Sequence, residues 1–395
     1  MSRTSLLIAL IAALVFASAT SSFAVDDNGL FELDGNATQE SATPPPDDWQ
    51  TLHAGGGGAS VFTGVMADPS PQSIFGGGHK DIQPLSQWGH KAGEVPDKDD
   101  LTHAYAASYN DEGDLVVYFG ADRVANAGDA FLGFWFFKQE VIAKADGSFS
   151  GAHSLGDTLV LVNFPQSANA VPEIAVVEWD PSCSRAASNN PSPGQCAAQN
   201  LRLLLEGSGS AGAVCGSVPS GALACAIAND GTVDAPWPYA SKDGFVNEFP
   251  FETFFEGGVN LSQLLGDACF ASFMAETRSS SSFTASLKDF SLDSFPVCKI
   301  GITKQCTHGD VNANETAFVY TYSGSVTNEG FGTVYDVTVT DKGQTFALGT
   351  LEPQESKDFG GTFESTLNPA TNQASVTAAQ SPGGEPVLSD QSDVA

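Results

Sequence analysis

The stretch YFGADRVANAGDAFLGFWFF, residues 118–137, decides the fold class of this chain. One apolar run ends at Phe119, a polar loop follows it, and a second apolar run, FLGFWFF, begins at Phe131. Short apolar runs bounded by Gly, Asn and Asp are typical of β-strands that are buried on both faces. The stretch therefore predicts two strands of a β-sandwich, joined by a loop that carries charged side chains.

Further short runs, rich in β-branched and aromatic residues, follow along the chain between Gly, Pro, Asn and Asp. The clearest are TLVLVNF (158–164), EIAVVEW (173–179), LRLLL (201–205) and FTASLKDF (283–290). The clearest helical signal is NLSQLLG, in which Asn260 can cap one turn and Gly266 can end it. Together these signals predict an all-β fold: a jelly-roll or concanavalin-like β-sandwich over residues 25–300, with a loop-rich N-terminal part.

The composition changes near residue 300, where Thr and Val begin to alternate. In VYDVTVTD, residues 334–341, valines alternate with polar residues, as expected of a half-buried antiparallel strand. The segments GSVTNEG (324–330), DVTVTD (336–341), LGTLEPQES (348–356) and NQASVTA (372–378) resemble the Ig-like repeat domains of bacterial surface proteins. The resemblance implies a small Ig-like β-sandwich over residues 301–395, of a kind that serves as a spacer or stalk.

The first 24 residues have the pattern of a secretory signal peptide. Arg3 supplies positive charge, LLIALIAALVFA an apolar core, and Ser22, Phe23 and Ala24 a small-x-small cleavage site. No later stretch approaches the ~18 uninterrupted apolar residues of a membrane-spanning helix. We therefore expect a secreted chain, extracellular or at the cell surface, with no integral membrane segment after cleavage.

The formal net charge is −31, with only 16 Lys and Arg residues. Nucleic acids and anionic lipids attract positive patches, so this balance argues against both as partners. An acidic excess keeps a protein soluble in an extracellular or salty medium, and it also supplies carboxylates that can bind Ca²⁺. Both interpretations stay open.

The seven cysteines lie between positions 183 and 306 and form no zinc or haem motif. Because exported proteins favour disulfides, we expect neighbouring cysteines to pair. The expected pairs are Cys183–Cys196, Cys215–Cys225 and Cys269–Cys298, which leave Cys306 over. A Cys298–Cys306 bond is the alternative to the third pair.

The larger region also has a resemblance of its own. Its segments FELDGNA (31–37), DDW (47–49), PDKDDLTHAYAASY (96–109), YFGADRVANAGDAFLGFWFF (118–137), FFEGGVNLSQLL (254–265) and CFASFMAETRSSSSFTASLKDF (269–290) are similar to an uncharacterised family of secreted bacterial proteins. The resemblance implies kinship over residues 31–298 but no activity.

The loop after Phe119 is a candidate calcium site. Asp122, Asn126 and Asp129 provide side-chain oxygens within eight residues, and oxygen ligands are those that Ca²⁺ prefers. In the alternative interpretation, Arg123 pairs with one of the aspartates and only shapes the loop. His103 is the histidine nearest to a charged cluster and is a further candidate for a functional role.

Two more pairs of residues are candidates for ligand binding. Glu276 and Arg278 lie two apart, so on a strand they share one face, either as part of a sugar-binding floor or as a structural ion pair. Trp237 and Tyr239 lie in APWPY, where prolines favour a surface loop whose rings can stack on sugars, although packing of the loop onto the sandwich is the alternative.

The sequence contains no GxSxG or HExxH motif, so it names no catalytic residue. We predict an extracellular binding or structural protein, active in adhesion, matrix or surface-layer interaction, through glycans and Ca²⁺. A secreted carbohydrate-active enzyme on the same scaffold is the first alternative, because fold does not separate the two. A subunit of an extracellular filament is the second.

Overall fold

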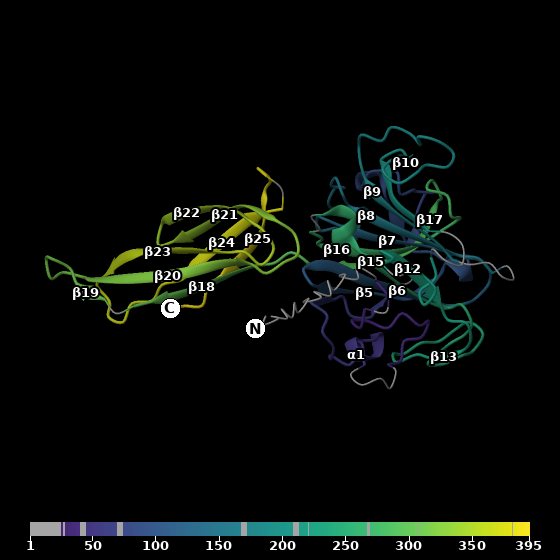
Figure 1. Cartoon of the computed structure of the whole chain (residues 1–395), viewed down its shortest axis with the longest axis horizontal. Helices are drawn as coiled ribbons and strands as arrows, with labels where there is room; N and C mark the ends of the chain where they lie inside the picture. The colour runs from purple at the N-terminus through teal and green to yellow at the C-terminus, as the bar shows by residue number, and fades with distance from the viewer. Residues whose placement is uncertain are drawn as a thin grey trace, which may run out of the picture.

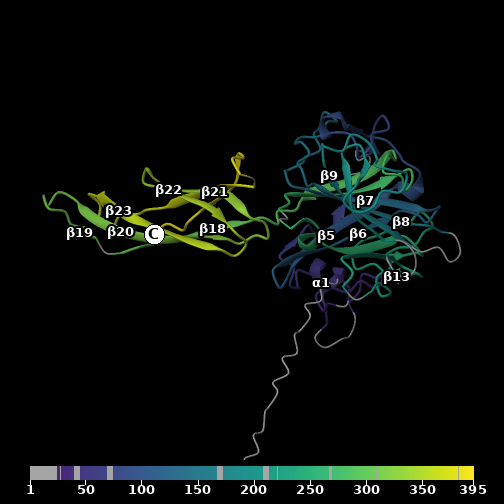
Figure 2. The same cartoon turned by 45° about the horizontal axis from the view of Figure 1, so that its top comes forward.

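The computed structural model describes residues 25–26, 28–39, 45–68, 74–166, 172–207, 213–219, 221–266, 269–307, 309–380 and 382–395. The predicted signal peptide, residues 1–24, lies outside this part of the chain. The described residues fold mainly as antiparallel β-sheet, with two short α-helices, α1 (Trp49–His53) and α2 (Leu261–Leu265). Figures 1 and 2 show two bodies, a large one that precedes β18 (Ile300–Cys306) and a smaller one that begins with that strand. The predicted all-β fold is confirmed.

The large body is a sandwich of two sheets. A six-stranded sheet has the order β1–β5–β6–β15–β12, with β2 also paired to β5. Its strands are β1 (Val61–Phe62), β2 (Met66–Ala67), β5 (Leu101–Asp111), β6 (Asp114–Arg123), β12 (Ala224–Ala228) and β15 (Phe254–Asn260). The chain crosses to the second sheet after β6, returns to the first sheet at β12, and crosses again after β15.

The second sheet has seven strands, in the order β10–β11–β9–β8–β7–β16–β17. Its strands are β7 (Ala130–Phe137), β8 (Thr158–Phe164), β9 (Glu173–Trp179), β10 (Cys196–Ala198), β11 (Leu201–Gly207), β16 (Ser272–Arg278) and β17 (Leu287–Ser294). The predicted runs at 158–164 and 173–179 are β8 and β9. The predicted turn at 260–266 is α2, where Asn260 accepts the N–H of Gln263 and Gly266 has a φ of +78°.

Both sheets are covered on their outer faces as well as packed against each other. Between the sheets, Phe134 and Phe136 of β7 pack against Phe119 of β6. On the outer face of the seven-stranded sheet, Trp135 and Phe137 of β7 lie under the segments around β3 (Ile74–Phe75), β4 (His90–Lys91) and residues 138–153. This double burial explains why FLGFWFF is apolar at almost every position.

The six-stranded sheet is covered in the same way by two other segments. One is the N-terminal segment, which brings Phe31 and Trp49 onto Tyr105 and Tyr118. The other contains β13 (Val233–Asp234) and β14 (Glu248–Phe249), whose Phe249 joins the same cluster. The predicted loop-rich N-terminal part is therefore a packed cover and not a loose appendage.

The small body is a second sandwich of two four-stranded sheets. Their orders are β18–β20–β19, with β23 paired to β20, and β22–β21–β24–β25. The strands are β18 (Ile300–Cys306), β19 (Asp310–Val311), β20 (Phe318–Asn328), β21 (Val334–Asp341), β22 (Gln344–Leu351), β23 (Ser356–Ser365), β24 (Ala374–Ala379) and β25 (Pro386–Gln391). Its core contains Val334, Val337 and Val339, the valines that alternate in the sequence.

The two bodies touch where β18 begins and where β20 turns into β21. The N–H of Glu329 donates to the carbonyl of Lys299 at 2.9 Å. Phe331, from the same turn, packs with Val297 into the core between the large sheets. Gly330 allows this approach, because a Cβ there would lie 2.6 Å from the backbone nitrogen of Lys299. The turn anchors the small sandwich to the large one.

Three disulfides close loops in the large body or at its end. They are Cys183–Cys196, Cys215–Cys225 and Cys269–Cys298, while Cys306 is free. The alternative bond between Cys298 and Cys306 is not formed. None of the helices in the described part of the chain is both long and apolar enough to cross a membrane.

The small sandwich contains a buried ion pair between Lys304 and Asp341, whose Nζ and Oδ2 atoms are 2.5 Å apart. Removing one partner of a buried pair leaves an uncompensated charge, which costs about 3–5 kcal/mol. We expect Asp341→Ala to lower the free energy of unfolding of this sandwich by that amount. Calorimetry of the full chain measures it, and tryptophan fluorescence follows the large sandwich separately because all five tryptophans lie there.

The matched control is Glu329→Gln, which breaks an exposed ion pair with Lys299 (2.7 Å). An exposed pair contributes about 0–1 kcal/mol, so this variant should unfold almost like the unmodified protein. If both variants changed the free energy of unfolding equally, the Lys304–Asp341 pair would not be what stabilises the small sandwich.

Candidate functional site

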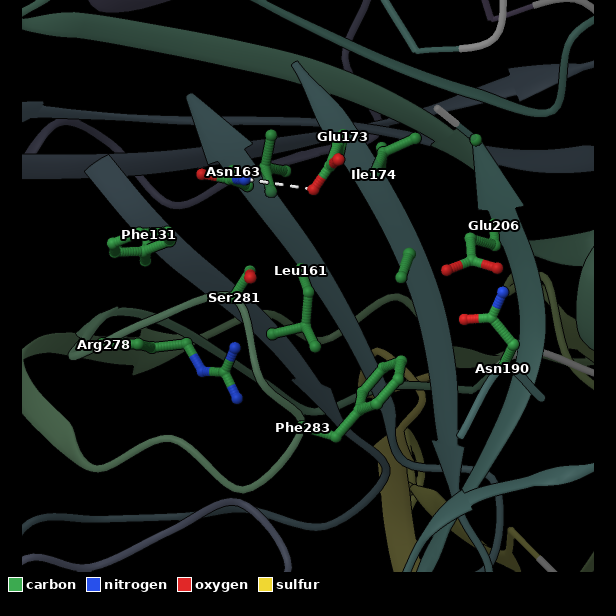
Figure 3. A pocket seen from close by; sticks show the side chains of 13 residues that line it. Phe131, Leu161, Asn163, Glu173, Ile174, Asn190, Glu206, Arg278, Ser281 and Phe283 are labelled. Atoms are coloured by element: carbon green, nitrogen blue, oxygen red, sulfur yellow. Dashed lines mark hydrogen bonds between the residues drawn. The ribbon is translucent and has the colours of Figure 1, made fainter. Parts of the chain in front are cut away.

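An open groove crosses the outer face of the seven-stranded sheet, beside the segments that cover the rest of it (Figure 3). Its volume is about 340 Å³. Strands β7, β8, β9, β11 and β16 and two loops supply its lining. The lining residues are Phe131, Leu161, Val162, Asn163, Glu173, Ile174, Ala175, Asn190, Glu206, Gly207, Arg278, Ser281 and Phe283.

The strand register arranges the floor of the groove in two rows. In the first row, Asn163 of β8 lies opposite Glu173 of β9, and its Nδ2 donates to Glu173 Oε2 at 3.1 Å. In the second row, Leu161 lies opposite Ala175, and Ala175 lies opposite Glu206 of β11. Because alternate residues of a strand share a face, both rows point into the groove.

Two loops form the rims of the groove. Asn190 lies in the loop that the Cys183–Cys196 disulfide closes, and Figure 3 shows its amide facing the carboxylate of Glu206. On the other side, Ser281 and the half-buried ring of Phe283 come from the loop between β16 and β17. The groove thus combines carboxylates, amides, a hydroxyl and aromatic rings, which are the groups that hydrogen-bond to and stack on sugars.

Arg278 is held at one end of the floor by a buried ion pair. It is 1 % exposed, and its Nε and Nη2 donate to Asp81 Oδ2 at 3.0 and 2.7 Å. Nη2 also donates to the carbonyl of Ser282 at 2.9 Å, while Asp81 Oδ1 accepts from Trp135 Nε1 at 3.0 Å. The guanidinium is therefore fixed in place at the edge of the groove.

Glu276, the predicted partner of Arg278, lies beneath the groove and does not line it. It is fully buried, and its Oε1 lies 3.6 Å from Arg278 Nε. Burial, and then the neighbouring Asp81 carboxylate, raise the pKa of Glu276 well above its usual range, so its protonated form is favoured. Gly133 of β7 makes room for it, since a Cβ there would lie 2.5 Å from Glu276 Oε1. Of the predicted pair, Arg278 alone reaches the groove.

Trp237 and Tyr239 lie on the opposite side of the large sandwich, under its cover. Both are only 3 % exposed. Trp237 packs edge-on against Tyr105 at 5.1 Å and donates from Nε1 to Asp122 Oδ2 at 3.2 Å. Tyr239 donates its hydroxyl proton to the carbonyl of Arg123 at 2.8 Å. Of the two interpretations of this loop, the surface stacking platform is wrong and packing of the loop onto the sandwich is correct, because the β13–β14 segment folds these rings onto the six-stranded sheet.

The side chains expected to bind calcium after β6 have separate partners. Asp122 is fully buried, and its Oδ1 lies 2.9 Å from His103 Nδ1. Burial raises the pKa of Asp122, while His103 opposes that rise. Asp129 instead accepts the backbone N–H of Gln166 at 2.8 Å. Asn126 accepts from Arg123 through Oδ1 at 2.9 Å. Calcium binding by these three side chains stays a prediction.

In the described part of the chain, Arg123 also forms no ion pair with an aspartate of this loop, which was the alternative interpretation. Arg123 donates instead to the carbonyls of Lys98, Gly128 and Glu252, and to Asn126 Oδ1, at 2.9–3.1 Å. Burial lowers the pKa of Arg123 to about 10. The arginine shapes the loop, as expected, but it does so through backbone carbonyls.

Three other carboxylates do converge. One oxygen from each of Asp68, Asp100 and Asp289 lies within 4.8 Å of the others, a geometry that can hold a cation. Asp289 also accepts the N–H of Leu101 through Oδ2 at 3.0 Å. This group could not be predicted from the sequence, because its members come from three distant segments.

Two buried carboxyl groups, those of Glu256 and Asp48, lie under the N-terminal cover. Glu256 accepts from the N–H of Gly35 at 2.7 Å and from Trp49 Nε1 at 2.8 Å. Asp48 is fully buried beside it. Burial, and next the carboxylate of Asp34, raise the pKa of Asp48 to about 8. Burial raises the pKa of Glu256 well above its usual range too, with Asp48 adding to the effect.

Most residues of the groove were not predicted from the sequence. Asn163 is the last residue but one of the run TLVLVNF, Glu173 begins EIAVVEW, and Glu206 follows LRLLL. A polar residue at or beside the end of each of three apolar runs was therefore a usable signal. These three residues lie on one face of the sheet because β8, β9 and β11 pair with one another. The sequence does not show which strands pair.

Comparisons with known proteins identify no family for this chain. No family model and no curated protein matches it. One solved structure, described as "Crystal structure of tetra-tandem repeat in extending region of large adhesion protein", aligns with 82 % of this chain and 92 % of its own, at 12 % identity and a TM-score of 0.16. A likeness of this size supports no conclusion about fold or function.

The buried Asp48 predicts a stability that falls as the pH rises. Its pKa is about 8 in the folded chain against 3.8 as the ordinary value, so the folded state holds a proton that the unfolded state releases. The stability that comes from this bound proton is fully present below about pH 4 and is lost by about pH 8. Between these values the free energy of unfolding falls by up to about 1.4 kcal/mol per pH unit. Asp48→Asn should flatten this slope and make the protein more stable than the unmodified chain at pH 8.

Urea unfolding of the large sandwich at several pH values, followed by tryptophan fluorescence, measures the slope. Asp243→Asn is the control, because Asp243 is exposed and its replacement should leave the slope unchanged. A slope that is the same in Asp48→Asn and in the unmodified protein would contradict the assignment.

Proposed function

We propose that this chain is an extracellular binding protein that holds a glycan in the groove of its seven-stranded sheet. The observation that carries the proposal is the register of the floor, which places Asn163, Glu173 and Glu206 on one open face of a sheet that is otherwise covered. Amides and carboxylates so placed accept and donate the hydrogen bonds that sugar hydroxyls need.

The location outside the cell is supported by the three disulfides and by the acidic composition. Disulfides persist in oxidising compartments, and a net charge of −31 favours solubility there. The small sandwich carries no comparable groove of mixed aromatic and polar lining among the described residues. We propose that it is a spacer that presents the large sandwich, as in an adhesion or surface-layer protein.

The second candidate is a carbohydrate-active enzyme in the same groove. Glu173 and Glu206 favour it, because they project from neighbouring strands at diagonal positions, and glycoside hydrolysis uses two carboxyl groups about 5–9.5 Å apart. The buried Glu276 is not available for this role, since its carboxyl group has no access to the groove. A binding protein leaves its glycan intact, and an enzyme cleaves it.

We expect the full chain to bind members of a broad glycan array, and Asn190→Ala to weaken the binding about threefold to tenfold, the effect of one lost hydrogen bond. Asn189→Ala is the matched control, because Asn189 is its exposed neighbour and does not line the groove. Titration calorimetry on an array hit gives the affinities, and chromatography of the incubated glycan detects any cleavage.

Three results would decide between the candidates. An intact glycan together with the expected difference between Asn190→Ala and Asn189→Ala supports a binding protein. Cleaved glycan, with cleavage lost in Glu173→Gln or Glu206→Gln, supports the enzyme. Binding that Asn190→Ala does not change would place the glycan elsewhere and overturn the proposal for the groove.

A further inference from the structure

We infer that the groove selects saccharides that carry free amino groups, with the amino groups at the end formed by β9 and β11. The inference rests on the proposed glycan binding and adds the chemical class of the ligand. It follows from how charge is distributed along the groove, which has two exposed carboxylates at one end and one compensated guanidinium at the other.

The carboxylates of Glu173 and Glu206 lack a protein cation. Both are exposed, and neither belongs to any ion pair in the described part of the chain. Arg278 is the sole basic side chain in the lining. Their nearest polar partners are the neutral amides of Asn163 and Asn190 (Figure 3). A ligand that supplies positive charge therefore meets two carboxylates that no basic residue in the described part of the chain neutralises.

The strand register allows these two carboxylates to share one ammonium group. Glu206 lies opposite Ala175, and Glu173 lies two residues from Ala175 on the same strand and the same face. Diagonal neighbours of this kind are about 7–8 Å apart at the backbone, within the reach of two glutamate side chains toward a common point. A neutral hydroxyl can donate to these carboxylates, but an ammonium group adds the attraction between opposite charges.

The other end of the groove suits uncharged oxygen atoms. The positive charge of Arg278 is compensated by Asp81, which binds its Nε and Nη2. Figure 3 shows the guanidinium beside the groove. This end of the groove therefore carries no uncompensated charge that would attract an ion. Acidic saccharides are disfavoured, because the two glutamates and the net charge of −31 repel them.

The test compares four sets of short oligosaccharides of equal length: oligomers of glucosamine, of N-acetylglucosamine, of glucose and of galacturonic acid. Binding to the full chain is measured by titration calorimetry at pH 6, where amines are protonated and carboxylates ionised. We expect glucosamine oligomers to bind at least tenfold more tightly than the acetylated and neutral ones, and galacturonate oligomers to bind most weakly. Raising the salt to 0.5 M should reduce the preference by screening.

The double variant Glu173→Gln/Glu206→Gln should remove the preference, so that glucosamine and N-acetylglucosamine oligomers bind to it with equal affinity, because glutamine keeps the size and one acceptor oxygen but carries no charge. Glu248→Gln is the matched control for non-specific attraction of amines to an acidic protein, since Glu248 is exposed on β14 outside the groove. Near-ultraviolet circular dichroism confirms that each variant is folded.

The outcomes separate the two proposals. Equal affinity for glucosamine and acetylated oligomers overturns the amino-group inference and leaves glycan binding intact. A preference that survives in the double variant, or that Glu248→Gln reduces as much, also overturns it. Absence of binding to every oligomer and to the glycan array overturns the proposed function and this inference with it. A preference lost in the double variant alone supports the inference.

Discussion

The buried ion pair between Arg278 and Asp81 connects the parts of the large sandwich on which the groove depends. Asp81 belongs to the segment that covers the seven-stranded sheet, whereas Arg278 ends β16 within that sheet. The same aspartate receives the indole N–H of Trp135, so one carboxylate fixes a cover segment to two strands. Losing one partner of such a pair costs about 3–5 kcal/mol. The pair therefore sets where the cover ends and where the open face begins.

Patterns within one strand were enough to predict much of the fold. The apolar run FLGFWFF indicated burial on both faces, and β7 is buried in this way because a cover segment lies over its outer face. Asn260 and Gly266 bounded the α2 turn as local capping chemistry requires. These features depend on neighbours in the chain, and that is why the sequence alone displays them.

Features that depend on distant segments could not be predicted in this way. The prolines around Trp237 signal a turn, but whether a turn lies on solvent or on a sheet depends on what that sheet has left uncovered. Arg123 suggested an aspartate partner close in sequence, yet its main acceptors include the carbonyl of Glu252 in another loop. Likewise, Asn163, Glu173 and Glu206 meet only through strand register.

The disulfide between Cys269 and Cys298 has a mechanical consequence. It joins the segment just before β16 to the segment just before β18. The β16–β17 hairpin therefore lies within the loop of chain that the disulfide closes. A pulling force on the small sandwich reaches the large one at residues 298–300. Without the bond, that force would peel β17 from β16 one hydrogen bond at a time. With it, the tension passes through the sulfur atoms to the start of β16, and the edge strand carries no load.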